Sequence, residues 1–278
     1  MLSSLLFSIL VAIDPPSADA QLLAKRLKYE RAFAGANVKD PAARIYFFPD
    51  DAAFPQVAIG GGWTTTFYIT NLGTATETAD LDFWTGSGGL WQASFQGTRA
   101  DRISLRIGPG QTAVLQSDNP STLETGWATL FNDNSSSANV VGVAVFRQRV
   151  TGRPDFEAGV PLTGLFDRRF VLQFDNTQGY VTSVALAAGV TSVSTTSTAV
   201  SVTVRDENGN TLATHALSLP AFGHTAFALS DRFPSTANRR GSIVFTSSTD
   251  SLSALGLRFT PGGAFTTMPI LTNAALQR

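Results

Sequence analysis

Few residues of this sequence can act as an acid, a base or a nucleophile. It contains two histidines, His215 and His224, and no cysteine. A serine hydrolase needs a histidine that is oriented by a carboxylate, and the best pairing here, His224 with Asp231, puts the two side chains at opposite ends of one strand. No G-x-S-x-G nucleophile elbow occurs. We therefore interpret His224 as a surface residue beside a turn, and we expect no catalytic residue and no enzymatic activity.

Metal ligands are also sparse. The two histidines have no acidic residue between them, which does not make a zinc-binding set. The segment "DENGN" (206–210) spaces its oxygen atoms like the start of an EF-hand loop, but the glycine and glutamate that such a loop requires do not follow. The dipeptide Asn208-Gly209 is instead typical of a type I′ turn between two strands. We expect a hairpin there, no metal site and no cofactor.

Paired carboxylates occur at i, i+2 spacing in Asp80/Asp82 and in Asp155/Glu157. A glycosidase places two carboxylates on either side of a cleft and raises the pKa of one of them. The sequence indicates no apolar pocket beside either pair. We therefore interpret both pairs as solvated charges on a strand.

The aromatic residues indicate a binding site more clearly than the acids do. All four tryptophans lie in the first half of the chain. Strand alternation places Tyr68, Asp80, Asp82 and Trp84 on outward faces. Aromatic rings stack on sugars while carboxylates bind sugar hydroxyls, so these four residues are a candidate glycan-binding face. Alternatively, the rings are covered by the leader, by a neighbouring sandwich or by another subunit.

The elements that carry these residues are predicted to be strands. In "WTTTFYITN" (63–71), apolar and polar residues alternate with period two, and in "TADLDFW" (78–84) the inward positions are Ala79, Leu81 and Phe83. Turn signatures such as Gly108-Pro109-Gly110 separate such segments. Short alternating strands between regularly spaced turns are typical of an antiparallel β-sandwich.

The sandwich is encoded twice. The segment "GQTAVLQSD" (110–118) recurs as "GHTAFALSD" (223–231), which aligns His224 with Gln111. Further segments recur in the same order, among them "GWTTTFYIT" with "GYVTSVALA" and "GVAVFRQ" with "ALGLRFT". We therefore predict two tandem immunoglobulin-like β-sandwich domains, residues 45–165 and 166–278.

The N-terminal region has a different pattern. The apolar run "LLFSILVAI" is too short to span a bilayer and is followed by Ala18-Asp19-Ala20, which resembles a signal-peptidase site, although no basic residue precedes the run. We predict a signal peptide over residues 1–20. Residues 21–44 are predicted to be a leader or linker, either helical or donated to a neighbouring molecule.

Composition limits the partners. Hydrophobic residues make up 43% of the 278 residues and charged residues 15%, which excludes a disordered chain. The net charge is −1 without a basic run in the predicted domains, so we expect no nucleic-acid partner. No later segment is long and apolar enough for a membrane helix, so we expect no stable membrane insertion.

Several motifs resemble those of a known group. "FPQVAIGGGWTTTFYITN", "GVAVFRQ", "EAGVPL" and "FDNTQGYVTSVALA" are similar to segments of secreted tandem β-sandwich repeat proteins of soil acidobacteria. The resemblance covers residues 54–271. It implies a bacterial, extracellular location and a sandwich fold, and it carries over no catalytic residues.

These observations favour a secreted, non-enzymatic structural or adhesive protein of the cell surface or extracellular matrix, which contacts other copies of itself or surface proteins. The lysines that often protect strand edges are absent after residue 44. The apolar segment Ile45, Tyr46, Phe47 and Phe48 is a candidate for strand donation to a neighbour, which would build filaments. The alternative is a carbohydrate-binding module that uses the aromatic face of the first domain.

Overall fold

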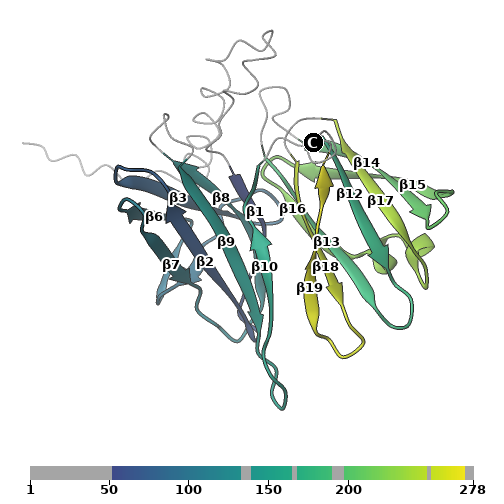
Figure 1. Cartoon of the computed structure of the whole chain (residues 1–278), viewed down its shortest axis with the longest axis horizontal. Helices are drawn as coiled ribbons and strands as arrows, with labels where there is room; N and C mark the ends of the chain where they lie inside the picture. Colours follow the sequence, from purple (N-terminus) through teal and green to yellow (C-terminus); the bar gives the residue numbers. More distant parts are fainter. Residues whose placement is uncertain (1–51, 133–138, 165–167, 190–196, 249–251, 273–278) are drawn as a thin grey trace, which may run out of the picture.

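The structure, a computed structural model, describes residues 52–132, 139–164, 168–189, 197–248 and 252–272 (Figure 1). These residues form strands, with a short helix α2 (Leu229–Arg232) and a 3-10 helix η2 (Pro234–Thr236). Neither described helix is long and apolar enough to cross a membrane. The predicted all-β fold is confirmed. The predicted signal peptide, the leader and the segment 45–48 lie outside the described residues, as does the predicted boundary at residue 165.

The strands fall into two sets along the chain. Those of the first half are β1 (Ala52–Ile59), β2 (Trp63–Asn71), β3 (Glu77–Trp84), β4 (Ala93–Phe95), β5 (Thr98–Ala100), β6 (Arg102–Ile107), β7 (Thr112–Gln116), β8 (Glu124–Asn132), β9 (Val140–Gln148), β10 (Phe156–Pro161) and β11 (Thr163–Gly164). Those of the second half are β12 (Arg169–Asp175), β13 (Val181–Ala188), β14 (Ser197–Asp206), β15 (Thr211–Pro220), β16 (His224–Ala228), β17 (Arg240–Ser247), β18 (Leu252–Phe259), β19 (Phe265–Met268) and β20 (Leu271–Thr272).

Both halves have the same strand order. The first half contains a five-stranded sheet, β11-β1-β8-β3-β6, and a four-stranded sheet, β10-β9-β2-β7. The second contains β20-β12-β17-β14-β15 and β19-β18-β13-β16. If the small hairpin β4-β5 is set aside, each strand of the first half has a counterpart at the same place in the second.

A buried threonine links the first two strands of each half in the same way. The Thr65 hydroxyl accepts a hydrogen bond from the Ala58 N–H (3.1 Å) and donates one to the Ala58 carbonyl (2.8 Å). The Thr182 hydroxyl makes the same pair of bonds to Asp175, at 3.1 and 3.3 Å. Since each threonine follows its partner by seven residues, the two halves match in local detail as well as in strand order.

The strand order differs from the predicted immunoglobulin type. An immunoglobulin constant domain places its first two strands in one sheet. Here β1 pairs with β8 in the five-stranded sheet, whereas β2 pairs with β7 and β9 in the four-stranded sheet. The antiparallel sheets of a sandwich are present, but this immunoglobulin feature is not.

The core of each half lies between its two sheets. In the first half, Phe54, Leu81 and Phe83 of the five-stranded sheet pack with Phe67 and Phe146 of the four-stranded sheet. The predicted inward positions Ala79, Leu81 and Phe83 are all buried. Alternation therefore identified the inner face of β3 correctly.

The hairpin between β14 and β15 differs in one detail from the sequence prediction. The Asp206 carboxylate accepts hydrogen bonds from the backbone N–H groups of Asn208 (2.9 Å) and Asn210 (2.8 Å). Gly209 has φ +85°, but Asn208 is not among the residues with positive φ. A type I′ turn needs positive φ at both central residues, so the predicted type is wrong, while the hairpin itself is confirmed.

The two halves lie side by side (Figure 1). Strands β13 and β18 of the second half contact β1 of the first, and β19 contacts β10. The four-stranded sheet of the second half thus packs with its outer face against an edge of the first half.

Candidate functional site

The predicted glycan-binding residues do not form one surface. Tyr68 lies on β2 in the four-stranded sheet, whereas Asp80, Asp82 and Trp84 lie on β3 in the five-stranded sheet. The two sheets pack together through their inner faces, so their outer faces point in opposite directions. Tyr68 is exposed on one of them, while the three residues of β3 are buried.

Asp80 and Asp82 are bound by side chains of the adjacent strand β6. The Arg102 guanidinium donates to both carboxylate oxygens of Asp82, at 2.5 and 2.7 Å, and lies 3.2 Å from Asp80. The Ser104 hydroxyl donates to Asp80 at 2.6 Å. The interpretation of these acids as solvated is therefore wrong, because β6 pairs directly with β3 and its polar side chains cover the carboxylates.

Trp84 is buried against the second half. Its ring lies 4.1 Å from that of Phe222, at an interplanar angle of 9°. Its indole N–H donates to the Thr129 hydroxyl at 3.1 Å. The neighbouring Trp127 donates its indole N–H to the Phe222 carbonyl at 2.8 Å. The predicted exposure of Trp84 is wrong, and the alternative that a neighbouring sandwich covers this ring agrees with these contacts.

His224 is also buried between the halves. Its imidazole lies 2.6 Å from the side-chain oxygen of Gln56 on β1, and its backbone N–H donates to the Gly86 carbonyl at 3.0 Å. Burial lowers the pKa of His224 to about 4, so the ring is neutral near pH 7. The expected surface position is wrong because Gln56 and Gly86 of the first half cover His224 at the start of β16.

The remaining candidates for chemistry are dispersed. Glu157 is paired with Arg147 at 2.7 Å on the surface, with Asp155 3.8 Å from the same arginine. The His215 ring contacts that of Phe233, with the ring centroids 4.7 Å apart and the planes tilted by 35°. Within the described residues, no group of three or more histidines and acids is placed to hold a metal ion.

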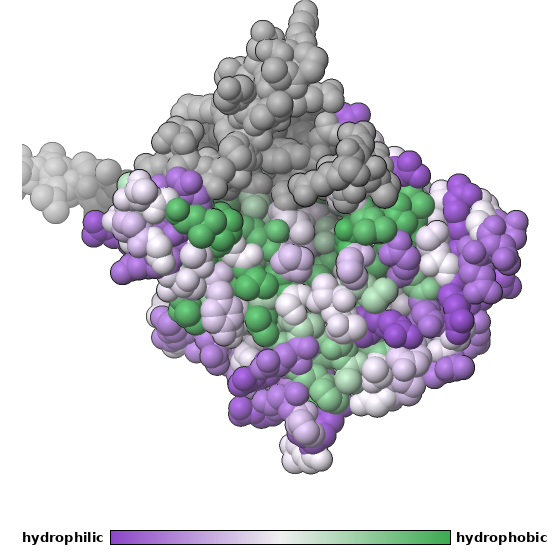
Figure 2. Space-filling view, in the orientation of Figure 1, coloured by the Kyte–Doolittle hydropathy of each residue, from purple (hydrophilic) through white to green (hydrophobic). Residues whose placement is uncertain are grey.

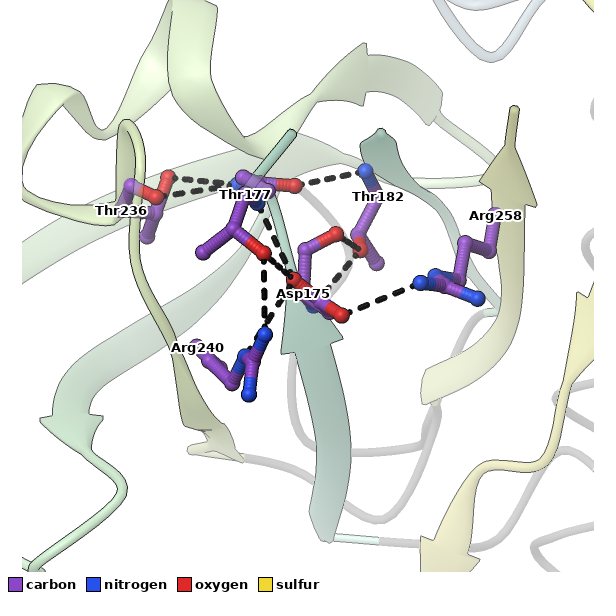
Figure 3. A network of polar contacts seen from close by, with 7 residues as sticks. Asp175, Thr177, Thr182, Thr236, Arg240 and Arg258 are labelled. Carbon is purple, nitrogen blue, oxygen red and sulfur yellow. Dashed lines mark hydrogen bonds and ion pairs between the residues drawn. The ribbon is translucent and has the colours of Figure 1, made fainter. Parts of the chain in front are cut away.

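A polar network surrounds Asp175 at the end of β12 in the second half (Figure 3). The Asp175 carboxylate accepts hydrogen bonds from the Thr177 hydroxyl (2.7 Å) and from Arg258 (3.0 Å), and Arg240 lies 3.7 Å away. Burial raises the pKa of Asp175, but the hydrogen bonds from Thr177 and the positive charges of the two arginines outweigh it and hold the pKa below its usual value. These bonds tie β12 to β17 and β18, so we interpret the network as structural.

An apolar cleft of about 250 Å³ lies between the halves. Its walls include Trp63, Phe146, Phe227 and Leu257. Gln56, one of its polar wall residues, is already bonded to His224. The cleft is therefore an imperfectly filled part of the contact between the halves.

The most distinctive exposed surface is the outer face of the first four-stranded sheet (Figure 2). We call it the valine face and define it by four exposed residues: Tyr68 (39%), Val114 (55%), Val141 (43%) and Val143 (38%). Tyr68 pairs with Val114 on one side and with Val143 on the other, so these three form a row across β7, β2 and β9. Val141 lies in the next outward row, opposite Thr70.

Of the four residues of the valine face, only Tyr68 is among the predicted binding residues. The signal for the others was present in "VVGVAVF" (140–146), which is apolar at inward and outward positions alike. Such a strand has two apolar faces, of which a sandwich core covers one.

No protein-family model, curated protein or solved structure matches this chain. The resemblance to acidobacterial repeat proteins remains a prediction.

Proposed function

We propose that this chain is an exported, non-enzymatic structural or adhesive protein that associates with other copies of itself through the valine face. One observation carries the proposal: Tyr68, Val114, Val141 and Val143 form a contiguous apolar surface on one sheet. Contiguous apolar patches on soluble proteins commonly mark interaction sites.

The chemistry of the face suits a protein contact. Valine on a strand has little rotamer freedom to lose, so its burial costs little entropy. Burying the exposed parts of these side chains contributes on the order of 1 kcal/mol each. Because association also costs translational and rotational entropy, we expect a contact that depends on protein concentration.

The matching strand orders support the predicted tandem duplication, with domains over residues 45–165 and 166–278. Export rests on the pattern of residues 1–20, and strand donation by residues 45–48 is a separate proposal. We do not extend the proposal to carbohydrate binding, because three of its four candidate residues are buried.

Static light scattering of the full chain from micromolar to millimolar concentration tests this function. We expect the average mass of the wild type to rise with concentration. Val143→Glu should suppress the rise, because a carboxylate would have to be desolvated in the contact. The matched control Thr214→Glu replaces an exposed residue of β15, an edge strand of the second half, and should behave like the wild type. A mass that stays monomeric, or a rise that Val143→Glu leaves unchanged, would refute the proposal.

A further inference from the structure

The valine face has a counterpart in the second half. Tyr68 pairs with Val143, and Ala185 pairs with Leu255 in the corresponding strands β13 and β18. One row further along, Thr70 pairs with Val141, and Ala187 pairs with Ser253. Val143 therefore corresponds to Leu255, and Val141 corresponds to Ser253.

The counterpart face is covered within the chain. Leu255 is 2% exposed and Ala185 is 5% exposed, whereas Val143 is 38% exposed. Both second-half residues pack into the hydrophobic cluster that contains the core of the first half. The same sheet face is thus an interface in one half and a bare surface in the other.

The element that covers it is an edge of the first half, made by β1, β10 and β11. The hydroxyls of Thr163 on β11 and Ser253 on β18 are 2.5 Å apart. The Thr267 hydroxyl donates to the Gly159 carbonyl on β10. Gln56 on β1 bonds to His224. An edge of one sandwich therefore lies on the sheet face of the next.

This edge also has a counterpart, made by β12, β19 and β20. Ala53 of β1 pairs with Thr163 of β11, and Val171 of β12 pairs with Leu271 of β20. Val171 and Leu271 are half-buried. The second edge therefore has valine and leucine where the first edge has alanine and threonine. Since the less apolar first edge makes a buried contact, the second edge is suited to make one as well.

We propose that the β12-β19-β20 edge of one copy docks on the valine face of the next copy and so repeats the edge-on-face part of the contact between the two halves of the chain. This inference rests on the proposed function and specifies its geometry. Because the two surfaces are different, the contact is head-to-tail, and it leaves a free face at one end and a free edge at the other. Such contacts build open chains unless the rotation between copies closes a ring.

The internal contact specifies which residues should meet between copies. Thr163 and Ser253 touch within the chain, and they correspond to Leu271 and Val141. Leu271 of one copy should therefore lie beside Val141 of the next. The sequence contains no cysteine, so a disulfide between introduced cysteines reports this contact without interference.

The experiment mixes two full-length variants, Val141→Cys and Leu271→Cys, under oxidising conditions and measures the cross-linked species. We expect mixed dimers to exceed either like-with-like dimer several-fold. Mixing Val141→Cys with the control Thr214→Cys should give no such excess. Cysteine is a small, weakly polar residue, and thermal unfolding of each variant verifies that it is folded.

The outcomes separate this inference from the proposed function. If Val141→Cys cross-links mainly to itself, the valine face meets its own copy face to face, and the head-to-tail geometry is wrong while self-association stands. If mixed dimers do not exceed the control although light scattering shows association through Val143, the docking edge is wrong. If light scattering also shows no association, both proposals fail.

Discussion

Replacing Phe222 with alanine should weaken the contact between the two halves of the chain. Phe222 belongs to the second half, and its ring is buried between the halves, where it stacks on Trp84 of the first half. The Phe222 backbone carbonyl accepts a hydrogen bond from the Trp127 indole N–H. Truncation leaves the backbone bond in place and removes the ring that lies between the sandwiches.

The expected cost follows from burial and packing. Removing a buried phenylalanine ring costs about 3–5 kcal/mol, through lost transfer free energy and the cavity that remains. An aromatic pair contributes about 0.5–1.5 kcal/mol beyond its buried area, and this also is lost. We therefore expect Phe222→Ala to lower the free energy of unfolding by about 4 kcal/mol.

Denaturant unfolding followed by tryptophan fluorescence is the appropriate assay. All four tryptophans lie in the first half, so their emission reports on that half although the substitution lies in the second. Emission of the folded variant should shift to longer wavelength, because Trp84 loses its cover. Phe245→Ala is the matched control. Phe245 is equally buried in the core of the second half, so this variant should be destabilised with its folded-state emission unchanged. A loss below about 1 kcal/mol with unchanged emission would refute the assignment of Phe222 to the contact.

Three further predictions follow from the same contact and its surroundings. Burial lowers the pKa of His224 from 6.5 to about 4 in the folded chain. As the pH falls below 6.5, the imidazole is therefore protonated in the unfolded chain before it is protonated in the folded chain. The free energy of unfolding should decrease by about 3 kcal/mol between pH 6.5 and pH 4. His224→Gln should remove this slope in denaturation midpoints, and an unchanged slope would contradict the assignment. Gly88→Ala would place a Cβ 2.0 Å from the Ala221 carbonyl oxygen at φ +84°, and it should lower the free energy of unfolding by at least about 2 kcal/mol. Gly97→Ala, at φ +79° with open space around it, should lower it clearly less. Equal losses of stability would argue against a close contact at Gly88. Arg102→Met should destabilise by about 3 kcal/mol, because Asp80 and Asp82 lose their bonds to the guanidinium, and a neutral result in thermal unfolding would show that these bonds matter little.

Alternation predicted which residues of a strand point inward, but it could not predict the sheet in which the strand lies. A period of two distinguishes two faces of one strand and contains no information about its neighbours. It therefore predicts one outward surface for Tyr68 and Trp84, although β2 and β3 belong to opposite sheets. The burial of Trp84 depends on Phe222, which is distant in the sequence.

The internal repeat predicted more of the fold than alternation did, but its register was wrong at one strand. The alignment of the two repeated segments places His224 opposite Gln111. In the structure, His224 pairs with Ala187, and Thr112 pairs with Thr70, the counterpart of Ala187. His224 therefore corresponds to Thr112, one residue away from the position given by the sequence alignment. A shift of one residue exchanges the two faces of a strand. Strand pairing rather than sequence similarity therefore determines which face of β16 meets the first half.

Hydroxyl-radical footprinting of Tyr68 in dilute and in concentrated full-length protein tests the central claim most directly. The valine face should be covered between copies as its counterpart is covered within the chain, so labelling of Tyr68 should fall steeply in concentrated protein. Labelling of Leu123, which is exposed and lies outside the valine face, is the internal reference. Equal labelling of Tyr68 at both concentrations, relative to Leu123, would contradict the account.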